Sequence, residues 1–337
     1  MRNIIYGAGS LGTVLGAFLE KNSEEITLVS RNVEHVKMLN EKGAKVVGNI
    51  EMCEKVHAVL PSEMEGKYDI IFLMTKQQDN ADAAAFLKDF MHEDSLVVAL
   101  QNGIPEPYLK EKLGENRVVG GIVEWGARLV APGVSELTSD ISANIIKLEK
   151  NEKVEPERLD KVKSILEKMC EVTLEENMTG ARWSKLLINA TFTGIGTSVN
   201  GTFGDVAKGK KTREIAVRSV KECIDICRTA GVTILPVQGN NIEKLFYYRS
   251  PVKKMIAKLI IPVAMKKHYK TEPSMLQDLK KGKKCEIDQI NGVVVQWGKK
   301  YGVDTPVNSR IVEIVKKEER GELPLSSSNI ELFNDLI

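Results

Sequence analysis

A glycine-rich loop near the amino terminus constrains the fold of this chain more than any other feature. Residues 4–6 form a short apolar strand pattern, and residues 13–20 form an apolar-rich helical pattern. The loop between them consists of Gly7, Ala8, Gly9, Ser10, Leu11 and Gly12. A strand, a GxGxxG loop and a helix in this order are typical of a unit that binds a dinucleotide.

Each glycine of this loop has its own physical role in such a unit. Gly7 permits the tight turn, Gly9 lets a pyrophosphate approach the backbone, and Gly12 allows the helix to pack closely on the strand. The amino end of the helix adds N–H groups and the positive end of the helix dipole. A glycine-rich turn without a ligand is the alternative, and the place of the motif between strand and helix favours binding.

The end of the second predicted strand indicates which dinucleotide is bound. Residues 25–29 form this strand, and Ser30, Arg31 and Asn32 follow it without an acidic side chain. Sites for NAD usually place Asp or Glu here to bond the ribose 2′-hydroxyl. Arginine instead presents a planar, permanently charged fork that suits a 2′-phosphate. We therefore expect NADPH or NADP+ as the cofactor, the alternative for Arg31 being a solvated loop residue.

Apolar strand patterns then alternate with helical patterns. Strands are expected at 70–74, 96–100 and 117–123, and helices at 81–90 and 106–113. Continuous apolar strands that alternate with helices imply a parallel, doubly wound sheet covered on both faces. Ligands of such sheets collect beyond the carboxyl ends of the strands, where Lys76 and Asn102 stand, so we expect both residues to approach the cofactor.

The pattern changes in the middle of the chain. Short alternating segments at 134–138 and 145–148 are expected to add antiparallel strands to the sheet edge, and a helix at 155–169 and a strand at 171–174 to complete the first domain. From residue 177 onward the pattern is helical with little strand signal. The sequence thus predicts an α/β domain at 1–176 and an all-helical domain at 177–337.

Composition excludes several other classes of protein. The 337 residues include 48 Lys and Arg against 46 Asp and Glu, and 42% are hydrophobic, as in an ordinary globular protein. The formal net charge of +2 argues against a dedicated nucleic-acid binder. The first residues lack the pattern of a signal peptide, and the longest apolar stretch, 255–265, is too short to cross a bilayer, so we expect a cytoplasmic protein without a membrane partner.

The cysteines agree with a reducing compartment. They are scattered, at Cys53, Cys170, Cys223, Cys227 and Cys285, and do not form a disulfide framework. Cys223 and Cys227 are four residues apart in a helical pattern, but no second Cys or His pair lies nearby. Two core thiols are therefore favoured over a zinc site, and we expect no metal.

One helix of the second half carries a polar stripe. Residues 182–193 read as a helix in which Lys185, Asn189 and Thr193 recur every four residues and so share one face. A lysine among so many apolar residues is a candidate for proton transfer. An exposed lysine on the wet side of the helix is the alternative.

The chain resembles the ketopantoate reductases (2-dehydropantoate 2-reductases) over nearly its whole length. The residues that carry the resemblance are the glycine loop with Arg31, Lys76 and Asn102, and three blocks of the second half: 183–189, 274–278 and 286–292. The last two blocks are much more specific than the glycine loop. Pro306 also fits the entry of the family's carboxyl-terminal helix.

The resemblance implies a Rossmann-type NADPH-binding domain, a helical domain and an active site between them. It implies the reduction of a 2-oxo acid, most simply 2-dehydropantoate to pantoate in pantothenate biosynthesis. Lys185 would then be the general acid and Glu286 the catalytically important carboxylate. Asn189, Thr193 and Ser274 would contact the substrate.

Two positions depart from the family pattern. Members that make pantoate commonly have asparagine where this chain has Thr193 and Thr271, and threonine lacks the reach and second donor of an amide. The segment 246–270 is also long and basic for the family's helical linker. These departures leave the natural 2-oxo acid open, and a homodimer is a further expectation because helical domains with exposed apolar stripes often dimerise.

Two other functions remain as alternatives. The enzyme alternative is a related NADP-dependent 2-hydroxyacid or opine-type dehydrogenase with a different 2-oxo acid. The alternative that is not an enzyme is a dinucleotide-sensing or nucleic-acid-binding protein, for which the lysines in 208–211 and 280–284 are the best support. Solvated helix ends explain those lysines better, and no nucleic-acid partner is expected.

Overall fold

The computed structural model describes residues 1–237 and 239–337. These residues divide into two compact units, Met1–Met178 and Thr179–Ile337.

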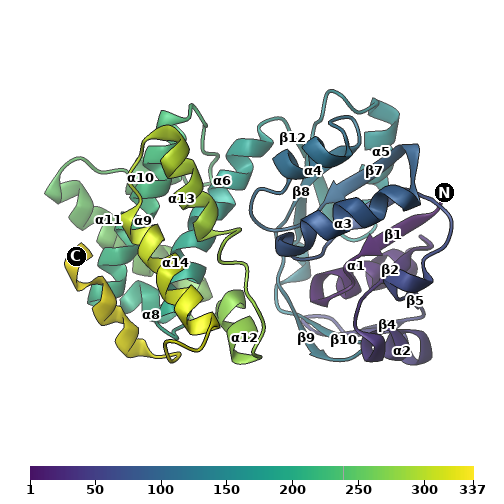
Figure 1. Cartoon of the computed structure of the whole chain (residues 1–337), viewed down its shortest axis with the longest axis horizontal. Coiled ribbons are helices and arrows are strands. Elements are labelled where there is room, and N and C mark those ends of the chain that lie inside the picture. Colours follow the sequence, from purple (N-terminus) through teal and green to yellow (C-terminus); the bar gives the residue numbers. More distant parts are fainter. Residues whose placement is uncertain (238) are drawn as a thin grey trace. The chain divides into compact units, whose positions relative to one another are not determined.

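Unit 1 alternates strands with helices (Figure 1). Its strands are β1 (Asn3–Tyr6), β2 (Thr27–Val29), β3 (Ala44–Gly48), β4 (Met52–Glu54), β5 (His57–Val59), β6 (Tyr68–Leu73), β7 (Met91–Ala99), β8 (Val118–Val123), β9 (Ala127–Ala131), β10 (Val134–Leu137), β11 (Ile145–Glu149) and β12 (Glu171–Glu175). Its helices are α1 (Ser10–Lys21), α2 (Val33–Lys42), α3 (Asn80–Leu87), α4 (Glu106–Leu113) and α5 (Pro156–Leu166), and the 3₁₀ turn η2 (Gln77–Asp79) directly precedes α3.

The large sheet of unit 1 has the strand order β12-β11-β8-β7-β6-β1-β2-β5. Neighbouring strands are parallel except for β11, which runs antiparallel to β8. The six strands from β5 to β8 have the order of a doubly wound dinucleotide-binding sheet, whose strand order reverses between β1 and β6. The predicted Rossmann-type sheet is therefore confirmed.

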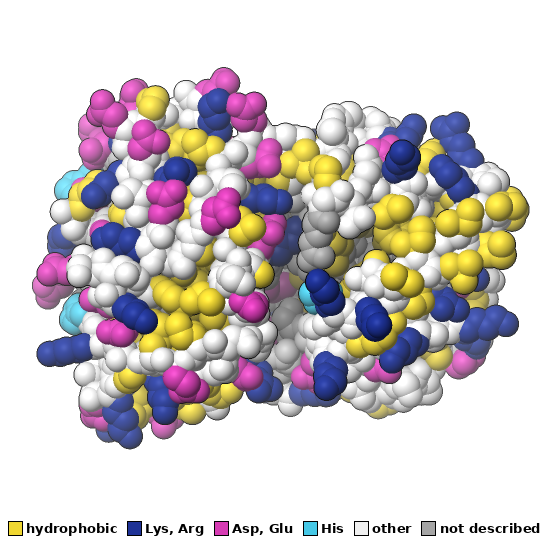
Figure 2. Space-filling model, turned by 180° about the vertical axis from the view of Figure 1, so that it is seen from behind, with side chains coloured by type: hydrophobic (Ala, Val, Ile, Leu, Met, Phe, Trp, Pro, Cys, Tyr) yellow, Lys and Arg dark blue, Asp and Glu magenta, His cyan; other side chains and the backbone are white. Residues whose placement is uncertain are grey.

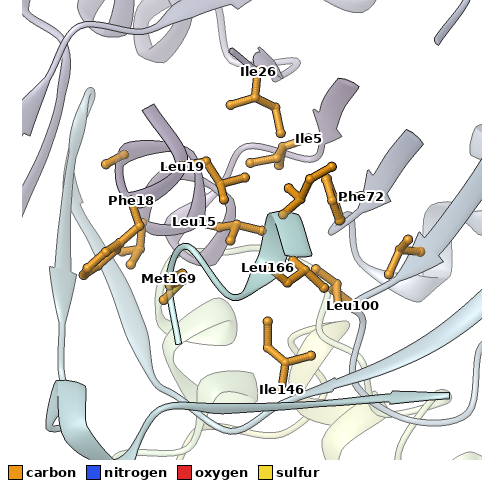
Figure 3. Close-up of a cluster of buried hydrophobic side chains, with 14 of the residues drawn as sticks. Ile5, Leu15, Phe18, Leu19, Ile26, Phe72, Leu100, Ile146, Leu166 and Met169 are labelled. Atoms are coloured by element: carbon orange, nitrogen blue, oxygen red, sulfur yellow. The ribbon is translucent and has the colours of Figure 1, made fainter. Parts of the chain in front are cut away.

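Helices cover both faces of this sheet because side chains alternate along each strand. On β1, Ile5 joins a buried cluster that includes Leu15 of α1 and Leu166 of α5 (Figure 3). Ile4 points to the other face and belongs to a second cluster, which includes Leu87 of α3. The end of β1 is thereby fixed between two packed layers, and the loop that follows it starts from a rigid base.

A second, smaller sheet corrects part of the sequence prediction. Its order is β4-β3-β10-β9, and β10 pairs in parallel with β3 rather than joining the edge of the large sheet. The other predicted addition, β11, does extend the large sheet in the antiparallel sense. Strand β10 joins the small sheet because this sheet packs on α1, which is buried almost all round. Val46 of β3 and Leu137 of β10 cover the apolar surface of α1 that the large sheet leaves open.

Unit 2 is helical, as predicted. Its elements are α6 (Met178–Ile188), the π-helical turn η5 (Asn189–Thr193), α7 (Gly194–Ser198), α8 (Phe203–Lys208), α9 (Lys210–Thr229), α10 (Ile242–Phe246), α11 (Pro251–Ala264), α12 (Ser274–Lys280), α13 (Asn291–Tyr301) and α14 (Pro306–Glu319). Helix α9 is the centre of the unit, because α8, α11, α13, α14 and η5 all pack against it. Among the described residues, no helix has both the length and the apolar character that a membrane crossing requires.

Helix α11 turns one polar face inward and one apolar face outward. Its Lys254 and Lys258 bond Glu214 of α9, and although burial opposes ionisation of this carboxyl, its bonds to these lysines and to Arg218 hold its pKa down at about 2. Figure 2 shows apolar side chains gathered on the surface of unit 2 at the end where α11 lies. The exposed apolar residues of this helix, called here the α11 stripe, are Val252, Met255, Ile256, Leu259 and Val263.

Glu318, near the end of α14, is a buried acid that makes the stability of unit 2 depend on pH. The residue is 8% exposed, and Asn329 donates a hydrogen bond of 2.9 Å to its Oε1. Its Oε2 has no hydrogen-bond partner among the described residues. Burial raises the pKa of Glu318 from 4.5 to about 7, against the opposite effect of the Asn329 bond. Folding therefore favours the neutral acid.

We predict that Glu318→Gln makes unfolding less dependent on pH. The stabilisation from the neutral acid is complete below pH 4.5 and is lost as the pH rises through about 7. Between pH 5 and pH 8 the wild type should lose up to about 3 kcal/mol of unfolding free energy relative to the variant. Urea unfolding of both proteins at the two pH values measures this, and a difference that stays constant with pH contradicts the prediction.

Candidate active site

The glycine loop lies where the strand order of the large sheet reverses. Gly7 has a φ of +108°, and a Cβ there would lie 2.4 Å from the backbone nitrogen of Thr75, which follows β6. A Cβ at Gly12 would lie 2.8 Å from the carbonyl oxygen of Gly7, so α1 packs directly on the loop. Both glycines are thus required by contacts within the protein itself.

Gly9 differs from these two glycines. It is exposed, its φ of −84° is open to other residues, and a Cβ there would meet no atom within 4 Å. No side chain of the described residues caps α1 at this position. The backbone of Gly9 therefore borders open space at the amino end of a helix, which is the kind of place a pyrophosphate occupies.

The loops after β6 and β7 are joined to each other by side chains. Gln101 donates to the carbonyl oxygen of Thr75 at 2.7 Å and to Oδ1 of Asn80 at 2.7 Å. Gln77 donates to the carbonyl oxygen of Asn102. Lys76 and Asn102, both half-buried, consequently stand on neighbouring loops at the carboxyl edge of the sheet, as the sequence predicted.

Arg31 extends from the end of β2, and its side chain is 71% exposed. Its Nη2 lies 2.6 Å from Oδ2 of Asp79, the last residue of η2. Sequence reasoning found the arginine and missed the carboxylate, because the two residues are 48 positions apart. The pairing is visible only once β2 and β6 are known to flank β1.

In unit 2, Lys185 is half-buried in α6. The sequence predicted one regular helix over 182–193, but the structure contains the π turn η5 from Asn189 to Thr193. A π turn inserts extra backbone into a helix, so the spacing of four residues no longer keeps side chains on one face. Asn189 is half-buried like Lys185, whereas Thr193 is only 5% exposed. Sequence alone gave no signal for this turn.

A buried polar network holds the π turn in place. Asn291, the first residue of α13, donates to the carbonyl oxygen of Ala190 at 2.8 Å and to Oδ1 of Asn308 at 2.9 Å. Glu222 of α9 accepts hydrogen bonds from the backbone of Val307 at 2.8 Å and of Asn308 at 3.0 Å. Burial raises the pKa of Glu222 to about 7, while these N–H donors act in the opposite direction. Helices α9, α13 and α14 are thereby linked to the π turn.

Ser274 and Glu286 stand on other elements of unit 2. Ser274 is the exposed first residue of α12, and α12 packs against η5 and α7. Glu286 is half-buried in the turn that leads into α13, where its carbonyl oxygen accepts the N–H of Gln289 at 3.1 Å. The rings of Trp183 and Trp297, 5.1 Å apart, join α6 to α13.

The candidate residues thus form two groups. The group in unit 1 consists of Gly7, Ala8, Gly9, Ser10, Leu11, Gly12, Arg31, Lys76 and Asn102. The candidates in unit 2 are Lys185, Asn189 and Glu286, which are half-buried, Ser274, which is exposed, and Thr193, which is buried. The strand order, the close packing at Gly12 and the open backbone at Gly9 fit a dinucleotide cofactor, so the chain is of the class that joins a Rossmann-type unit to a helical one.

Comparison with known families identifies the group within this class. Residues 4–150 match the family described as ketopantoate reductase PanE/ApbA, and residues 177–319 match the C-terminal region of the same family. The chain belongs to the ketopantoate reductase family. It is 30% identical to the 2-dehydropantoate 2-reductase of Pyrococcus horikoshii over 95% of this chain and 98% of that protein. The enzyme of the same name from Aquifex aeolicus is 29% identical over 95% and 97%.

Solved structures share the fold. A PanE/ApbA family ketopantoate reductase from Ralstonia eutropha has a TM-score of 0.80 at 23% identity, over 96% of this chain and 99% of that one. D-mandelate dehydrogenase in a ternary complex with NADH and anilino(oxo)acetate has a TM-score of 0.81 at 23% identity, over 95% and 99%.

Two glycine substitutions should separate folding from cofactor binding. We predict that Gly9→Ala changes the unfolding free energy by less than about 1 kcal/mol, because its Cβ meets no protein atom. It should weaken NADP+ binding at least about tenfold, because the methyl group enters the space that a pyrophosphate needs. Calorimetric titration and urea unfolding measure the two effects.

Gly7→Ala is the matched comparison. Its positive φ and its contact with Thr75 should cost more than about 1 kcal/mol of unfolding free energy. If Gly9→Ala binds NADP+ as the wild type does, the cofactor does not approach this part of the loop.

Proposed function

We propose that this chain catalyses the NADPH-dependent reduction of 2-dehydropantoate (ketopantoate) to pantoate, a step of pantothenate biosynthesis. The observation that carries the proposal is the identity of 30% to a 2-dehydropantoate 2-reductase over 95% of the chain, which includes both units. The proposed enzyme is an NADP-dependent oxidoreductase that acts on a CH–OH group. A cytoplasmic setting fits its scattered cysteines, two of which, Cys223 and Cys227, are buried in α9.

In this proposal unit 1 holds the cofactor. The backbone of the loop from Gly7 to Gly12 binds the pyrophosphate, and the exposed guanidinium of Arg31 binds the 2′-phosphate. Lys76 and Asn102 complete the site from the loops after β6 and β7. The support is their common position at the carboxyl edge of the sheet and the open space above Gly9.

Unit 2 provides the acid and the substrate contacts. When bound, the reduced nicotinamide supplies a hydride to the carbonyl carbon of the substrate. The Lys185 ammonium donates a proton to the carbonyl oxygen, on which negative charge develops, and its charge also attracts the anionic 2-oxo acid. Glu286 accepts a hydrogen bond from the substrate, and Asn189 and Ser274 supply further polar contacts.

Lys185 provides the decisive test of this function. The purified wild type should oxidise NADPH when ketopantoate is added, and Lys185→Ala should lower kcat by about 10²-fold or more with little change in NADPH binding. Lys185→Arg is the matched control, since it keeps the positive charge but is a far weaker acid, and it should also be slow. Steady-state kinetics and fluorescence titration with NADPH measure these effects.

Two outcomes would contradict the proposal. Turnover of ketopantoate that is unchanged in Lys185→Ala removes the proposed acid. Turnover of other 2-oxo acids but not of ketopantoate, in a panel of smaller and larger substrates, would assign the chain to a different reductase.

We also propose that the enzyme is a homodimer held by the α11 stripe. Leu259 and Val263 are 63% and 76% exposed, and a two-fold axis would bury the stripes of two copies against each other. Leu259→Glu should shift the protein toward the monomer in sedimentation velocity, whereas Val33→Glu, at an exposed valine of unit 1, should not. A wild type that sediments as a monomer rules out the dimer.

A further inference from the structure

The guanidinium of Arg31 already has an anionic partner in the structure. Asp79 Oδ2 lies 2.6 Å from Arg31 Nη2, and the Asp79 side chain is only 23% exposed. The carboxylate is therefore held against the guanidinium and is not free in solvent. Any group that binds at Arg31 meets this carboxylate.

The side chain of Asp79 does not cap helix α3, although the residue stands at the capping position. It is the N-cap residue of α3, where an aspartate usually accepts a hydrogen bond from the backbone of the first helical turn. Among the described residues no such side-chain cap bond forms, and the Asp79 φ of −91° and ψ of 0° are not the extended values typical of a cap. The carboxylate instead crosses to the end of β2.

The pair lies beside the glycine loop. Tyr6 is the last residue of β1 and directly precedes Gly7. Burial raises the pKa of Tyr6, the charge of Arg31 lowers it, and the charges of Asp79 and Asp82 raise it. Gly7 and Ala8 also donate to the carbonyl oxygen of Val29, two residues before Arg31, at 3.0 Å and 2.8 Å, so the pair lies in the region where the proposed cofactor binds.

Arginine and carboxylate select different dinucleotides. A guanidinium favours the 2′-phosphate of NADP(H), while a carboxylate accepts a hydrogen bond from the ribose 2′-hydroxyl of NAD(H) and repels a phosphate. Sites with this sheet topology usually place the carboxylate at the end of the second strand. In this chain the strand end carries Arg31, and η2 brings a carboxylate to the same place.

We propose that Asp79 is a specificity-determining residue that counteracts the preference of Arg31 for NADP(H). Its carboxylate accepts a hydrogen bond from the ribose 2′-hydroxyl of NAD(H) and repels the 2′-phosphate of NADP(H). The inference rests on the proposed function only in that unit 1 holds a dinucleotide. It goes further because it predicts that the site binds both NADP(H) and NAD(H), with only a moderate difference in affinity.

Nucleotide fragments test the proposal without the catalytic reaction. Calorimetry with 2′,5′-ADP and with 5′-AMP, which differ only in the 2′-phosphate, measures how strongly the site selects that group. Asp79→Asn and Asp79→Ala should each raise the ratio of the affinity for 2′,5′-ADP to that for 5′-AMP about tenfold. Loss of the carboxylate strengthens binding of the 2′-phosphate and at the same time weakens binding of the 2′-hydroxyl. Arg31→Ala should lower the same ratio.

A matched control separates local contact from overall charge. Asp82→Asn removes one negative charge from the exposed first turn of α3, near the same tyrosine, and should change the ratio less than twofold. Near-ultraviolet circular dichroism shows whether each variant is folded. Asp79→Asn keeps the size of the side chain and removes no cap bond, so it should retain the wild-type spectrum.

The outcomes are distinct from those that test the reductase activity. A ratio that stays constant or falls in both Asp79 variants overturns the proposal, and so does a wild type that binds 2′,5′-ADP more than about 10³-fold tighter than 5′-AMP. Failure to reduce ketopantoate, with the shift in ratio intact, would refute the proposed function and leave the role of Asp79 standing.

Discussion

The close approach of Gly7 to the backbone of Thr75 is the contact on which the rest of unit 1 depends. It places the loops after β1 and β6 side by side, at the point where the sheet reverses its strand order. No side chain fits between them, so the loop after β1 is free to present its backbone to a ligand. The side-chain bonds of Gln101 and Gln77 extend the same edge to the loop after β7.

In unit 2, buried hydrogen bonds between side chains hold the functional candidates in place. Its functional candidates stand on a helix that departs from regular geometry, and the departure is held by buried polar groups. Asn291 bonds the π turn, Asn308 bonds Asn291, and Glu222 bonds the start of α14. The stability of such a core depends on the orientation of its polar groups as well as on how well its side chains fill the space, because each hydrogen bond is lost if one partner rotates.

The sequence was sufficient for features that depend on neighbouring residues. The glycine loop, the buried strands of the large sheet and the helices between them follow from local patterns, and the family blocks named the candidates in unit 2. Features that depend on distant pairs could not be predicted. Strand β10 pairs with β3, which lies far back in the chain, and Asp79 meets Arg31 across 48 positions. The π turn escaped because its residues read as an ordinary helix, and Asn291, which bonds it, comes from another element.

The π turn between Asn189 and Thr193 has a consequence for how such enzymes diverge. One extra residue is accommodated there without moving either end of the helix. Loss of that residue would restore a regular helix and leave the following side chains in their present directions, whereas an insertion into a regular helix turns them by about 100° around the axis. A single-codon deletion in the π turn would therefore change the groups at the turn itself and keep those that α7 presents to its surroundings. Helices with such a turn can gain or lose one residue there while the side chains on either side of it keep their positions.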